Sequence, residues 1–63
     1  MNNSELETVY TRLCQTMTQL GESQAPLFLA RFALLASVQV GQAEIVERLI
    51  ADAAEGLAQS APD

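Results

Sequence analysis

Cys14 is the residue of this sequence whose type most directly suggests chemistry, because it carries the only thiol among the 63 residues. A catalytic or redox-active thiol needs a nearby positive charge that favours the thiolate, and Arg12 and Arg31 are the candidates for that charge. The alternative is a thiol that only packs among apolar neighbours. Cys14 lies at the edge of an apolar helix face, which favours a thiol that only packs. A thiol switch centred on Cys14 is kept as a second, less favoured hypothesis.

The eight carboxylates are the other groups that could take part in chemistry, since a pair of them can act as general acid and base. The sequence contains no histidine, no lysine and no glycine-rich phosphate loop. Glu44, Glu47 and Asp52 fall on the polar side of a predicted helix, where a solvated surface explains them. Di-metal helical bundles use Glu-x-x-His pairs, and one thiol without an imidazole cannot complete a zinc site. We therefore predict no catalytic residue, no metal, no cofactor and no enzymatic activity.

The length and the charge of the chain narrow the classes of partner. A domain of this size buries only about 60% of the surface that its unfolded chain exposes, and usually needs a disulfide, a metal or a partner chain. A single cysteine allows no internal disulfide, so a protein partner is the remaining support. The net charge of -5 at pH 7 opposes binding to phosphate backbones and to anionic lipid. We predict a protein partner, and neither nucleic acid nor a membrane.

The distribution of apolar residues favours a cytoplasmic protein. The first ten residues are polar and acidic, whereas a signal peptide begins with a basic stretch and an apolar core. The longest apolar run, residues 25 to 36, contains Arg31 and is shorter than the ~20 residues that span a bilayer. We expect neither a signal peptide nor a membrane span here.

Three helices are predicted, over about residues 5–20, 24–40 and 43–57. The first begins with Ser-Glu-Leu-Glu, in which Ser4 as N-cap and Glu7 form a capping box, and Gly21 ends it. Its apolar residues repeat at spacings of four and three and form one face: Leu6, Tyr10, Leu13, Met17 and Leu20. The third helix has one apolar side as well. We expect residues 1–3 to be a disordered start, 4–57 a single helical domain and 58–63 a disordered tail.

The central helix differs because it has no polar side. Ser23 is its predicted N-cap and Pro26 fits its first turn. A helix that is apolar all round is a buried helix, but two neighbours packed side by side cover only half to two-thirds of its circumference. The uncovered part of the helix is a continuous apolar strip, and it exceeds the few hundred Å² of exposed apolar surface that soluble monomers usually tolerate. We therefore predict an interface formed by Tyr10, Leu27, Phe28, Arg31, Phe32, Leu35 and Val38.

Two kinds of association fit this interface. The helix can dock in a groove of a larger protein, or it can cross its own copy in a symmetric dimer, where Ala33 and Ala36 allow a close approach. Arg31 also has two interpretations. It either extends along its own helix to reach water or a carboxylate of this chain, or it binds a carboxylate of a partner. The residues do not choose between these alternatives.

Residues 9 to 54 resemble a family of short bacterial proteins of unknown function, whose layout is a Y-x-R-L helix, an LFLARFALLL-like helix, a VG break and a short last helix. The segments that carry the resemblance are VYTRLC, GESQAPLFLARFALLASVQVG and IVERLIADA. Members of this family resemble companions of flavin-dependent aromatic hydroxylases. The resemblance implies an accessory subunit docked on a larger enzyme, and it implies no catalytic residue. The recurring positions are matched by Tyr10, Arg12, Arg31 and Phe32.

One departure from that family concerns the start of the third helix. Gln42 and Ala43 stand where an Asp-Pro-like helix start is expected. Glutamine is a poorer N-cap than aspartate, so we expect a weakly capped third helix.

Taken together, the residues predict an all-α protein, a helical hairpin or three-helix bundle with an over-hydrophobic central helix. The predicted function is a non-catalytic protein-interaction module, an accessory subunit that docks on a larger bacterial enzyme through that helix. The alternative is a homodimer with the same helix at the dimer interface.

Overall fold

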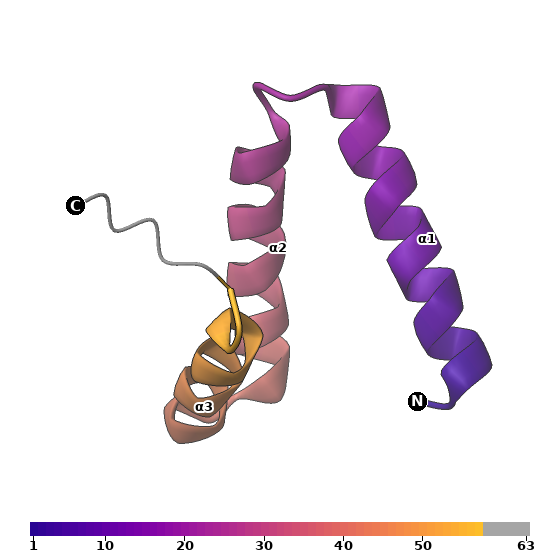
Figure 1. The fold of residues 1–63 in the computed structure, drawn as a ribbon. Helices are drawn as coiled ribbons and strands as arrows, with labels where there is room; N and C mark the ends of the chain where they lie inside the picture. Colours follow the sequence, from indigo (N-terminus) through magenta and orange to yellow (C-terminus); the bar gives the residue numbers. More distant parts are fainter. Residues whose placement is uncertain (58–63) are drawn as a thin grey trace.

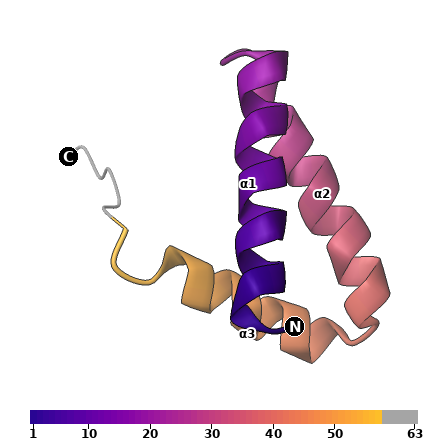
Figure 2. The same ribbon diagram turned by 90° about the vertical axis from the view of Figure 1, so that its right-hand side faces the viewer.

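Three α-helices make up the computed structural model, which describes residues 1–57. They are α1 (Asn3–Leu20), α2 (Ala25–Val40) and α3 (Ala43–Ala54). The predicted all-α, three-helix architecture is confirmed. α1 and α2 form a hairpin that opens away from its turn (Figure 1), and α3 runs across the open end of α2 at a steep angle (Figure 2).

The start of α1 has the predicted kind of cap at a different place. Asn2 is the N-cap: its Oδ1 accepts a hydrogen bond from the N–H of Glu5 at 2.7 Å, and its own N–H donates to Glu5 Oε1 at 2.9 Å. The prediction of Ser4 as N-cap and Glu7 as its partner is therefore wrong by two residues. Asparagine caps as well as serine does, and Asn-Asn-Ser-Glu carries the same reciprocal spacing. Asn2 and Asn3 consequently belong to the helix and its cap, so the predicted disordered start at residues 1–3 does not apply to them.

The turn between α1 and α2 is built from backbone hydrogen bonds. Gly21 ends α1 as predicted, with a φ of 87° that suits glycine, and its N–H donates to the carbonyl oxygen of Met17 at 3.0 Å. The N–H of Ala25 donates to the carbonyl oxygen of Gly21 at 3.0 Å. Pro26 lies in the first turn of α2, as predicted, but the N-cap is Gln24 and not Ser23, and it makes no side-chain cap. The tight turn satisfies the Ala25 amide through the backbone, which leaves no role for a serine cap.

The boundaries of α3 also follow from its ends. Gly41 is left-handed, with φ 80° and ψ 1°, and ends α2. Gln42 then precedes α3 without any side-chain cap, which agrees with the weakly capped start expected from the sequence. α3 ends at Ala54, three residues before the predicted end, because Glu55 is extended and Gly56 has a φ of 79°. The tail predicted to be disordered, residues 58–63, lies outside the described residues.

The packing of the helices is more open than the side-by-side arrangement expected from the sequence. Within residues 1–57, no side chain is fully buried, and no two Cα atoms twelve or more residues apart approach within 8 Å. The radius of gyration is 13.7 Å, whereas a compact chain of this length has roughly 10.6 Å. Neighbouring helices thus touch beside their connecting turns and then diverge. α2 is therefore covered even less than the half to two-thirds that we expected.

Candidate protein-interaction surface

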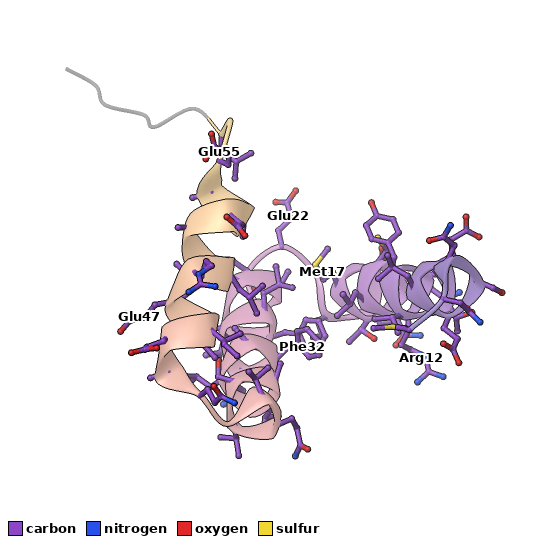
Figure 3. The ribbon with its side chains drawn as sticks, turned by 90° about the horizontal axis from the view of Figure 1, so that it is seen from below. Arg12, Met17, Glu22, Phe32, Glu47 and Glu55 are labelled. Atoms are coloured by element: carbon purple, nitrogen blue, oxygen red, sulfur yellow. The ribbon has the colours of Figure 1, made fainter. Side chains whose placement is uncertain are left out.

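One side of α2 faces α1. Phe28 and Phe32 line a groove of about 440 Å³ with residues of α1, among them Val9 and Leu13. Figure 3 shows the Phe32 ring in the space between the two helices. Phe28 and Leu13 are half-buried, while Phe32 remains 41% exposed. The two phenyl rings therefore face the groove between α1 and α2 and leave it open.

A second side of α2 faces α3. It carries the small residues Ala33, Ala36 and Ser37, which let the two helices approach. The Ser37 hydroxyl donates to the carbonyl oxygen of Ala33 at 2.7 Å, so this polar group is satisfied within its own helix. The apolar side of α3 completes a groove of about 230 Å³, lined there by Val46, Leu49, Ile50 and Ala53. α3 therefore directs its apolar side toward α2, as its amphipathic pattern predicts.

The remaining side of α2 faces neither helix, and we call it the outer face. Its aliphatic members are among the most exposed of the chain: Leu34 and Leu35 are each 69% exposed and Val38 is 73% exposed. Helical spacing of three, four and seven places these residues on one side. The outer face consists of Leu27, Arg31, Leu34, Leu35 and Val38.

Arg31 is the one charged residue of the outer face, and it is exposed. The side-chain hydrogen bonds of the described residues all stay within one helix or its cap, and none of them involves Arg31. The guanidinium therefore has no hydrogen-bonded carboxylate among residues 1–57. The structure therefore shows no carboxylate partner for Arg31 within residues 1–57, and both contact with water and contact with a carboxylate of a partner stay predictions.

Cys14 and Tyr10 lie together on α1, one helical turn apart. Cys14 is half-buried, and Tyr10 is 67% exposed. The Cys14 thiol raises the pKa of the Tyr10 phenol above its usual 10.0, first through side-chain hydrogen bonding and then through charge repulsion. Arg12 lies two residues from Cys14, and residues at this spacing do not face each other on a helix. Arg31 lies on the outer face of α2, so the positive charge that a reactive thiol needs is not beside Cys14.

The carboxylates of α3 lie apart from its contact with α2. Figure 3 shows Glu47 and Glu55 pointing away from the other helices. Among the described residues, no three potential ligands gather in a way that holds a metal ion. In that same part of the chain, no helix is both long and apolar enough to cross a membrane.

The structure separates the predicted interface residues into three groups. Leu27, Arg31, Leu35 and Val38 come together on the outer face, while Phe28 and Phe32 turn toward α1. Tyr10 lies on α1, where it is exposed and lines neither groove beside α2. Leu34 belongs to the outer face and was missing from the predicted interface. The signal that identifies it is its position seven residues after Leu27, which places both on one stripe.

Compared with known protein families, curated proteins and solved structures, the chain has no match.

Proposed function

We propose that this chain is a non-catalytic protein-interaction module, whose helix α2 is covered by another polypeptide. The observation that carries the proposal is the outer face, which combines four large aliphatic side chains with high exposure. Full burial of a leucine or valine side chain stabilises by about 1.5–3 kcal/mol. A partner that buries these side chains, which the described helices leave exposed, therefore gains several kcal/mol of binding free energy.

The proposal includes an accessory role on a larger bacterial enzyme. Its support is the resemblance of residues 9 to 54 to a family of short bacterial proteins, whose members resemble companions of flavin-dependent aromatic hydroxylases. A helix that presents anchors at i, i+4, i+7 and i+11, as Leu27, Arg31, Leu34 and Val38 do, is the form in which helices dock in grooves. The second candidate is self-association, which the same spacing favours because it suits helix pairing.

A mass measurement in extract of the native host tests the proposed function. The tagged wild-type chain is expected to elute in an assembly larger than its own 6.8 kDa. Leu35→Asp places a carboxylate on the outer face and is expected to elute as the free chain. Thr11→Glu, on the exposed polar side of α1, adds the same charge and is expected to behave as wild type. A wild-type chain that remains helical and elutes alone contradicts the proposal.

A further inference from the structure

The chain exposes more surface than a monomer of its mass is expected to expose. Its accessible surface is 5672 Å², whereas a compact monomer of 6.8 kDa exposes roughly 4,000 Å². The surplus is more than about 1,000 Å², which is the lower limit of the area that each partner buries in an obligate dimer. The surplus belongs to the whole open chain, including the two grooves beside α2, and its size is that of a permanent interface.

The outer face has the spacing of a helix-pairing seam. Leu27, Arg31, Leu34 and Val38 follow each other at intervals of four, three and four residues. This is the alternation of a and d positions, with leucine at d and a β-branched valine at one a position. A single polar residue at an a position fixes register in such seams, and Arg31 holds that place.

The position of Arg31 selects the antiparallel direction for two copies of α2. In a parallel pair Arg31 faces its own copy, and two guanidinium groups at such a distance repel each other. In an antiparallel pair Arg31 faces Leu34 of the partner subunit, and Leu27 faces Val38 of the partner subunit. The seam is complementary to itself in this direction, as a two-fold interface requires.

Charge also favours a second copy as the occupant. Arg31 is the only charged side chain between Ser23 and Ala43, so two copies can meet through α2 without opposing carboxylates, although each chain carries a net charge of -5. Arg31 lies in the two central layers of this short seam, and its guanidinium can reach water beside the seam along its aliphatic stem.

We infer that a second copy of this chain covers the outer face of α2, in an antiparallel pair that sets Arg31 of one protomer against Leu34 of its partner subunit. The inference rests on the proposed function and takes its second candidate, self-association, in place of docking on a larger enzyme. The pair also explains how a chain of this length is stable. Residues 1–57 bury no apolar side chain within one protomer, and the interface between two protomers supplies such a core. Two-fold dimers are the commonest form of self-association.

Sedimentation and cysteine cross-linking of the purified full chain test the inference. Wild type is expected to sediment at twice its 6.8 kDa, with a dimer fraction that falls on dilution. Arg31→Cys and Leu34→Cys, each combined with Cys14→Ser, are then mixed and oxidised. In the antiparallel pair, the Cα atom of residue 31 faces the Cα atom of residue 34 of the other protomer, whereas in a parallel pair each of these residues faces its own copy. The disulfide between the two different variants is therefore expected to exceed either homodisulfide at least about fivefold. Ala51→Cys, on the polar side of α3, is the control and is expected to form no disulfide above background.

The outcomes separate this inference from the proposed function. A helical wild-type monomer at every concentration overturns the second copy, and a dominant Leu34→Cys homodisulfide overturns the antiparallel arrangement. Ala51→Cys cross-linking as fast as the mixed pair also overturns it. The sedimentation result uses no variant, so poor folding of a cysteine variant does not affect it. If the purified chain is monomeric but enters an assembly in host extract that Leu35→Asp disrupts, the interaction function stands and only the second copy fails.

Discussion

The outer face of α2 and the polar side of α3 are two exposed helix surfaces with opposite chemistry. Leu34 and Leu35 are each 69% exposed on α2, and Glu44 and Glu47 are exposed on α3. Water solvates the carboxylates of α3 at no cost, whereas aliphatic side chains in water cost about 25 cal/mol for each Å². An amphipathic helix such as α3 is satisfied by one neighbour. α2 needs neighbours on three sides, and the described chain supplies two.

The largest expected effect comes from placing the same charge on each of these surfaces. Leu34→Asp removes an apolar side chain from the outer face and introduces a carboxylate that a covering chain desolvates. We expect association to weaken about 100-fold or more, which corresponds to about 3 kcal/mol. Ala51→Asp places aspartate on the polar side of α3, where we expect only the ~0.5 kcal/mol helix-propensity cost. Sedimentation equilibrium measures both dissociation constants, and equal effects of the two variants contradict the distinction between the surfaces.

Replacing Arg31, the one charge of the outer face, is expected to change the dissociation constant less than Leu34→Asp does. The direction of the change decides whether Arg31 faces a second copy or a carboxylate of a different partner. A polar residue at an a position specifies register at a cost in stability. In the antiparallel pair, Arg31→Leu is therefore expected to tighten association about tenfold, or ~1.4 kcal/mol. If Arg31 instead binds a carboxylate of a different partner, the same variant weakens that complex. Arg31→Lys is the control, because it keeps the charge but loses the planar fork of donors.

The number and order of the helices, and the apolar faces of α1 and α3, could be predicted because they follow from helix-ending glycines and from the spacing of apolar residues. Glycines at 21 and 41 end two helices, and both have positive φ values in the structure. The apolar spacing of Leu6, Tyr10 and Leu13 marks one face of α1 wherever that helix begins. The cap of α1 was misplaced because Asn2 and Ser4 are equally good N-caps, each with a glutamate three residues later. Hydrogen-bond geometry, not residue type, decides between them.

The division of α2 into three sides could not be predicted from its sequence. A helix without a polar side gives no signal for which residues meet which neighbour. Phe28 and Phe32 were predicted at the interface together with Leu35, yet they turn toward α1, because the short turn at residues 21–24 places α1 on their side. Leu34 faces away from both neighbours for the same reason. Such assignments depend on the angles between helices, which two connecting turns set and which apolar periodicity does not encode.

The start of α3 offers a smaller, stabilising change. Gln42 is the N-cap of α3, in extended conformation and without a side-chain hydrogen bond. Gln42→Ser supplies a hydroxyl that accepts from the free amides of the first turn, and is expected to raise the free energy of unfolding by about 0.5–1 kcal/mol. Gln42→Ala lacks that acceptor and is the matched control. Urea unfolding at one fixed concentration of chain measures both, and a gain equal in the two variants shows that capping is not its cause.

The smallest expected effect concerns Cys14 and decides whether the thiol has a role. Cys14 is half-buried on α1, next to Tyr10 and without an arginine on its side of the helix. Cys14→Ser changes a sulfur to an oxygen of similar shape, and such a half-exposed substitution is expected to change the free energy of unfolding by less than about 1 kcal/mol. We expect the mass of the assembly to stay the same as well, with or without hydrogen peroxide. An assembly that dissociates on oxidation in wild type but not in Cys14→Ser establishes a thiol switch, and then α1 regulates the association that α2 makes.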